Sequence, residues 1–83
     1  MAAAVKLLAF AGTRDVIGSA ELRFEIRDTA TVGELMDEIC LRFPALRPHR
    51  GSVRLAVNGS YAQSDDPVAD GDEVALIPPV AGG

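Results

Sequence analysis

The fold is decided by one stretch, Thr31-Val32-Gly33-Glu34-Leu35-Met36-Asp37-Glu38-Ile39-Cys40-Leu41-Arg42-Phe43-Pro44. Thr31, with Glu34 three residues later, matches a capping box, in which each side chain accepts a free backbone N–H of the other residue at a helix start. Pro44 ends the helix, because the residue before a proline avoids helical backbone angles. Apolar residues recur three and four positions apart, so they share one helical face and predict an amphipathic helix packed on a core. This face consists of Val32, Leu35, Met36, Ile39, Cys40 and Phe43.

Two strands are predicted before this helix. Residues 5–10 form an apolar run that is typical of a largely buried strand. Residues 20–27 alternate between apolar and charged side chains, which indicates a half-buried antiparallel strand. Residues 12–19 hold two glycines and an aspartate, which favour turns. We therefore expect the two strands to form a hairpin with this segment as the connecting turn.

Strands are also predicted after the helix. Residues 44–52 lack periodicity and are expected to form a loop, whereas residues 53–57 alternate as a strand does. Asn58 and Gly59 are the strongest short signal for a type I′ hairpin turn. Residues 60–62 should therefore return as a short strand.

The last strand is predicted at residues 73–77, after a polar loop at residues 65–72. Pro78 and Pro79 lack backbone N–H groups and cannot extend the ladder. The first and last strands are both apolar, which suits adjacent central positions in a sheet. Parallel pairing of these two strands, flanked by hairpins, gives the β-grasp arrangement of ubiquitin. We expect an α+β fold in which a mixed four- to five-stranded sheet packs on one main helix.

Composition restricts the classes of function. A net charge of -4 with only 8 Lys and Arg residues argues against nucleic-acid binding, which requires a basic surface. Cys40 is the only cysteine, so no internal disulfide can form, and this suits a reducing compartment. No apolar run approaches the roughly 20 residues of a membrane span. We expect a cytoplasmic protein that binds neither nucleic acid nor membrane.

No arrangement of residues indicates an enzyme that acts alone. The 83 residues hold one His and one Cys, and they lack a nucleophile elbow and a phosphate-binding loop. The carboxylates of residues 65–73 lack the spaced bidentate Glu of a calcium loop. We expect no metal site and no bound cofactor.

The C-terminus points to a carrier role. The chain ends in Ile77-Pro78-Pro79-Val80-Ala81-Gly82-Gly83, which presents a carboxylate on a thin tip without side chains. A terminal carboxyl group has a pKa of about 3.5, so it is ionised and is a poor electrophile at neutral pH. Joining it to AMP creates a leaving group that a sulfur nucleophile would displace, leaving a terminal thiocarboxylate. We therefore assign residues 1–77 to the β-grasp domain and residues 78–83 to a flexible carrier tail.

A carrier also needs a docking surface. The sheet face opposite the helix is free, and it should present Phe10, Tyr61 and Ile77, with Arg14 at its rim. Exposed aromatic and aliphatic patches of this kind mark interfaces. The alternative is that Phe10 and Ile77 cap the core at the sheet edge.

Four motifs resemble one known family. Residues 8–15 are similar to its first strand and the turn that follows, residues 31–35 to its helix start, and residues 57–59 to its hairpin. The most specific match is Asp70-Gly71-Asp72-Glu73-Val74-Ala75-Leu76-Ile77-Pro78-Pro79-Val80-Ala81-Gly82-Gly83, which resembles the "DGDEVA-x-x-PPV-x-GG" ending. The family is the small, sulfur-carrying subunit of molybdopterin synthase.

This resemblance implies a ubiquitin-like β-grasp fold and a non-catalytic sulfur-donor subunit. An ATP-dependent, E1-like enzyme would adenylate Gly83, and the product would be converted to a thiocarboxylate. The tail would enter the large catalytic subunit and donate sulfur to cyclic pyranopterin monophosphate, forming the molybdopterin dithiolene. Two small and two large subunits would form a heterotetramer.

The resemblance also assigns site residues. Gly82 and Gly83 would form the reactive end, and the partner interface would consist of Phe10, Arg14, Tyr61, Ile77, Pro78, Pro79, Val80 and Ala81. Tyr61 and Ile77 differ from the residue types usual at these positions in the family. Three alternatives remain open at this point: a sulfur carrier of the thiamine pathway, a ubiquitin-like modifier conjugated through Gly83, and a plain binding module.

Overall fold

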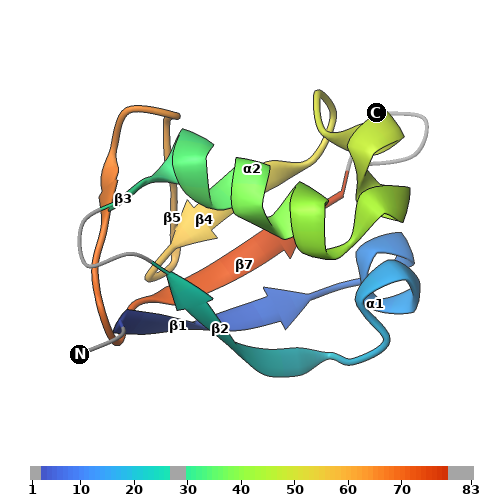
Figure 1. Ribbon diagram of the computed structural model, residues 1–83, viewed down its shortest axis with the longest axis horizontal. Coiled ribbons are helices and arrows are strands. Elements are labelled where there is room, and N and C mark those ends of the chain that lie inside the picture. Colours follow the sequence, from blue (N-terminus) through green and yellow to red (C-terminus); the bar gives the residue numbers. More distant parts are fainter. Residues whose placement is uncertain (1–2, 27–29, 79–83) are drawn as a thin grey trace.

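In the computed structural model, which describes residues 3–26 and 30–78, a five-stranded mixed sheet packs against one long helix (Figure 1). The main sheet has the order β2-β1-β7-β4-β5. Its strands are β1 (Ala3–Ala9), β2 (Glu21–Ile26), β4 (Arg54–Val57), β5 (Ser60–Tyr61) and β7 (Glu73–Ile77). A second, two-stranded sheet pairs β3 (Ala30–Thr31) with β6 (Pro67–Val68). The helices are α1 (Gly12–Ile17), α2 (Val32–Arg42) and the 3-10 helix η1 (Pro44–His49).

The first and last strands lie side by side at the centre of the sheet. β1 and β7 are parallel, with Leu7 opposite Val74 and Ala9 opposite Leu76. β2 and β4 flank them in antiparallel pairing. The predicted α+β, β-grasp arrangement is therefore confirmed.

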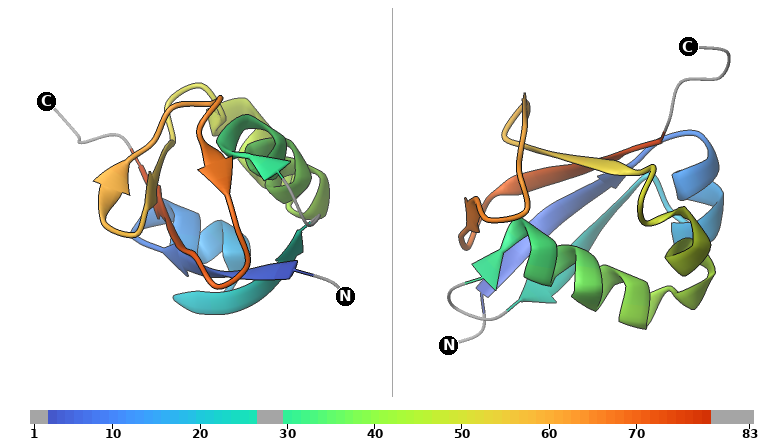
Figure 2. Two further views of the ribbon diagram at one scale, coloured as in Figure 1. Left: turned by 90° about the vertical axis from the view of Figure 1, so that its left-hand side faces the viewer. Right: turned by 90° about the horizontal axis from the view of Figure 1, so that it is seen from above.

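α2 covers one face of this sheet and leaves the other face uncovered (Figure 2). Leu35 and Ile39 on the helix, and Val74 and Leu76 on β7, are each 0% exposed. Each fully buried side chain of this kind contributes on the order of 1.5–3 kcal/mol to stability relative to an exposed one. Cys40 is also buried on this face, as the helical pattern predicts.

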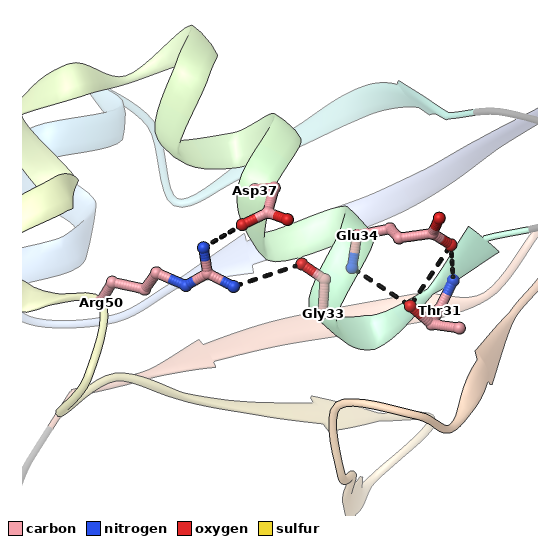
Figure 3. A network of polar contacts seen from close by, with 5 residues as sticks. All are labelled: Thr31, Gly33, Glu34, Asp37 and Arg50. Carbon is pink, nitrogen blue, oxygen red and sulfur yellow. Dashed lines mark hydrogen bonds and ion pairs between the residues drawn. The ribbon is translucent and has the colours of Figure 1, made fainter.

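The start of α2 is fixed by the predicted capping box (Figure 3). The Thr31 hydroxyl accepts the Glu34 backbone N–H at 3.2 Å, and the Glu34 carboxylate accepts the Thr31 backbone N–H at 2.9 Å. Asp37 of the same helix forms an ion pair with Arg50, whose guanidinium also lies 3.5 Å from the Gly33 carbonyl oxygen. These contacts tie the segment after η1 to the outer surface of α2.

The segment between the first two strands differs from the prediction, because it contains the helix α1 instead of a simple turn. The Thr13 hydroxyl accepts the Phe10 backbone N–H at 3.0 Å and donates to the Phe10 carbonyl at 2.6 Å. At the other end Gly18 has φ 84° and donates its N–H to the Arg14 carbonyl at 2.8 Å. A glycine in the left-handed region is a helix stop, so Gly18 terminates α1 instead of marking a loop.

Two segments predicted as loops also contain regular structure. Residues 44–52 include η1, whose Leu46 is 1% exposed. Residues 65–72 include β6, in which Val68 pairs with Ala30 and is 2% exposed. In both segments, one apolar side chain is buried in the core, and its burial packs an otherwise polar segment against the rest of the domain.

Candidate protein-docking face and carrier tail

The uncovered side of the main sheet, called the outer face below, is the side opposite α2. The strand register places Leu8, Ala75, Ala56 and Tyr61 in one row across β1, β7, β4 and β5. Paired residues of neighbouring strands point to the same face, so these four side chains lie together. Tyr61 is 64% exposed at one end of the row.

A second row lies beside the first, toward the end of β7. Arg54 pairs with Ile77, and both Ile77 and Phe10 follow the Ala9–Leu76 pair by one residue. Phe10 is 49% exposed and Ile77 is half-buried. The structure thus brings the predicted residues Phe10 and Ile77 to the outer face, next to the row that ends in Tyr61.

The position of Tyr61 depends on the hairpin between β4 and β5. Asn58 and Gly59 have φ 52° and 89°. Positive values at both central residues are required by a type I′ turn, so the predicted turn is confirmed. This tight turn sets Tyr61 opposite Ala56 on the outer face.

Arg54 is a residue of the outer face that was not among the predicted site residues. Its guanidinium carbon lies 4.8 Å from the centroid of the Tyr61 ring, within the roughly 6 Å range of a cation–π contact. The sequence does indicate that Arg54 faces outward. Residues 53–57 alternate as a strand does, and Val53 and Leu55 are buried, so Arg54 between them must point to the opposite face. Its contact with Tyr61 follows only once the register of β4 and β5 is known.

Arg14 and Pro78 lie at the margins of this region. Arg14 is exposed on α1, the helix that follows Phe10. Pro78 is half-buried directly after β7 and lines, with His49, a largely apolar pocket of about 310 Å³. The remaining predicted site residues lie outside the described residues: Pro79, Val80, Ala81, Gly82 and Gly83.

The described residues offer few features for other kinds of site. Within residues 3–26 and 30–78, no cluster of three or more His, Cys, Asp and Glu side chains could hold a metal ion. Over the same residues, no helix has the length and apolarity needed to cross a membrane.

Comparisons with known proteins agree with the fold. A family model described as the ThiS family matches residues 7–83. The molybdopterin synthase sulfur carrier subunit of Chlamydomonas reinhardtii is 41% identical over 81 residues, which cover 95% of this chain and 98% of that protein. The crystal structure of SAMP1 from Haloferax volcanii has a TM-score of 0.83 at 32% identity and covers 96% of this chain and 99% of that one.

One chain of a solved protein–protein complex is also similar. A chain in the protein–protein complex of subunits 1 and 2 of the molybdopterin-converting factor from Helicobacter pylori has a TM-score of 0.67 at 25% identity. The match covers 96% of this chain and 99% of that chain. Since the family model extends over almost the whole sequence and the fold agrees, the chain belongs to the ThiS family.

Proposed function

We propose that this protein is the sulfur carrier subunit of a molybdopterin synthase and is not catalytic by itself. The observation that carries the proposal is the family match, which covers residues 7–83 and so includes Gly83. It is supported by relatives that are molybdopterin synthase sulfur carrier subunits, and the match to the one from Chlamydomonas reinhardtii covers 98% of that protein. We place the carrier in the cytoplasm, since the single cysteine, Cys40, is buried and unpaired and suits a reducing compartment.

The chemistry resides at the Gly83 carboxylate. In an activating enzyme, a carboxylate oxygen attacks the α-phosphorus of ATP and releases pyrophosphate, giving an acyl-adenylate. Sulfide then attacks the carbonyl carbon and displaces AMP, which leaves a thiocarboxylate; where the donor is a persulfide, a thiol must also cleave the resulting S–S bond. In the large subunit, this sulfur is transferred to cyclic pyranopterin monophosphate and water restores the carboxylate. Each step uses catalytic groups of a partner, which matches the absence of catalytic motifs in this sequence.

The outer face supplies the docking contact. Its exposed Phe10 and Tyr61 beside Ile77 fit the aromatic and aliphatic anchors of protein interfaces. The similar chain from Helicobacter pylori is held in a complex of subunits 1 and 2, which supports a large-subunit partner here. The five residues after Pro78 span up to about 17 Å when extended, so a docked body would let Gly83 reach a buried active site. We propose a heterotetramer of two carriers and two large subunits.

Intact-mass spectrometry tests the proposal directly. Protein isolated from its own cells is expected to contain a fraction in which one terminal oxygen is replaced by sulfur, and a variant that lacks Gly83 should show none. Incubating the sulfur-loaded form with the large subunit and cyclic pyranopterin monophosphate should produce molybdopterin. Sulfur loading without this transfer would instead indicate another pathway, such as thiamine synthesis.

Protein modification is a second candidate function. It is favoured by similarity to small archaeal modifier protein 1 of Haloferax volcanii, which is 34% identical over 82 residues. The same activated Gly83 would then form an isopeptide bond with a lysine of a target protein. Finding Gly83 on lysine side chains of other proteins, with no terminal thiocarboxylate, would favour this function over sulfur transfer.

A further inference from the structure

The cationic side chains of the outer face are not equivalent. β1 and β2 contribute Lys6 and Arg23, and each has a carboxylate partner within the fold. The Lys6 ammonium lies 3.4 Å from Glu21, and the Arg23 guanidinium lies 3.8 Å from Glu25. Arg54 on β4 differs, because no acidic side chain of residues 3–26 and 30–78 forms an ion pair with it.

Arg54 is held in a defined position although its charge is unpaired in this part of the chain. Its guanidinium stacks over the Tyr61 ring at 4.8 Å, and its backbone pairs with Ile77. A stacked guanidinium keeps its N–H donors at the edge of its plane, where they fit the two oxygens of a carboxylate. The stack also restricts the side chain before binding, which lowers the entropy lost on docking.

The surroundings of Arg54 determine which ligand it suits. Ile77 and Phe10 continue its row as apolar contacts, so a partner covering them would also remove water from the guanidinium. Removing water from the guanidinium costs binding free energy unless the partner supplies a hydrogen-bonding group in its place. Proteins whose surface lacks an acidic side chain at this point should therefore bind more weakly. The chain as a whole carries a net charge of -4, so a cation at this point of the surface can help to define the orientation of a partner.

We propose that Arg54 is a specificity-determining residue that binds a carboxylate side chain on the large subunit, while Phe10 and Ile77 make the neighbouring apolar contacts. This inference rests on the proposed function. It specifies the docking surface of the large subunit, which would hold an acidic group within an apolar patch. Tyr61 is the positioning residue that holds the guanidinium for this contact.

The test is titration calorimetry of the full chain with the large subunit from the same organism, at several NaCl concentrations. Arg54→Gln is expected to weaken binding by about tenfold and to reduce its dependence on salt, because one interfacial ion pair is lost. Arg54→Glu should weaken binding further, since it sets two like charges against each other. The matched control is Arg23→Gln, which removes a cation from the same face but should leave the affinity within about twofold of wild type.

Other outcomes overturn the inference in separable ways. If Arg54→Gln binds as tightly as the wild-type chain does, the carboxylate contact does not exist, although the carrier function stands. If both variants weaken binding equally, the effect is a general electrostatic one and Arg54 has no specific role. If the wild-type chain does not bind the large subunit, the proposed function fails and the inference fails with it. Thermal unfolding of each variant checks that the fold is intact.

Discussion

Gly33 shows how a single residue can be restricted by a distant segment. Its N–H donates to the Ser64 carbonyl at 2.8 Å, and a Cβ added at this position would lie 3.2 Å from both the Ser64 Cβ and the Ser64 oxygen. Alanine normally favours a helix over glycine by up to about 1 kcal/mol. Here the added methyl must displace a hydrogen-bonded backbone, so we expect Gly33→Ala to lower the free energy of unfolding by about 1 kcal/mol.

Chemical denaturation measures this effect against a matched variant. A Cβ at Gly51 meets nothing within 4 Å, so Gly51→Ala should stay within about 0.5 kcal/mol of wild type. Equal stability of the two variants would show that the segment around Ser64 can shift to accommodate the methyl group without a loss in the free energy of unfolding.

At the same scale, sequence reasoning succeeded where partners are close along the chain. The capping box of Thr31 and Glu34 and the turn at Asn58 and Gly59 are local patterns, and both were confirmed. The constraint at Gly33 and the stacking of Arg54 on Tyr61 depend on how separate segments are placed. No local pattern contains that information, so the role of Arg54 could be argued only from the structure.

The two faces of β7 are expected to have separate roles. Leu76 is 0% exposed against α2, whereas its neighbour Ile77 is half-buried on the outer face. Leu76→Ala should therefore cost about 2–5 kcal/mol of stability. Ile77→Ala should cost much less stability but weaken large-subunit binding at least about tenfold, as expected of an interface anchor.

Denaturation curves and binding titrations on both variants separate these roles. If Ile77→Ala were to destabilise the fold as much as Leu76→Ala while binding normally, Ile77 would belong to the core edge. That was the alternative left open by the sequence.

The elements also show why part of the fold was missed. Strands β1, β2, β4 and β7 and helix α2 each repeat their pattern often enough to be recognised. α1 has 6 residues and β6 has 2, so neither completes enough periods to stand out from turn residues. β6 exists because it pairs with β3, and η1 because Leu46 reaches the core. These are tertiary causes, which a single segment does not reveal.

At the scale of the whole molecule, the body and the reactive end are expected to be separable. In the described part of the chain, the buried core residues lie at or before Leu76, and β7 is paired on both sides, with β1 and β4. Deleting Gly82 and Gly83 should therefore leave the free energy of unfolding within about 0.5 kcal/mol of wild type. The same deletion should abolish adenylation, because it withdraws the carboxylate from the reach of the activating enzyme.

Denaturation and ATP–pyrophosphate exchange with the activating enzyme measure these two effects independently. The Arg23→Gln variant serves as a full-length control, since it changes a surface charge but keeps the terminus intact. A large loss of stability would show that the tail contributes to the core, and the proposed boundary at residue 78 would be wrong. Undiminished exchange would show that the enzyme does not require the terminal glycines. Loss of exchange with full stability is the result that assigns the reaction to the tail and the stability of the fold to the body.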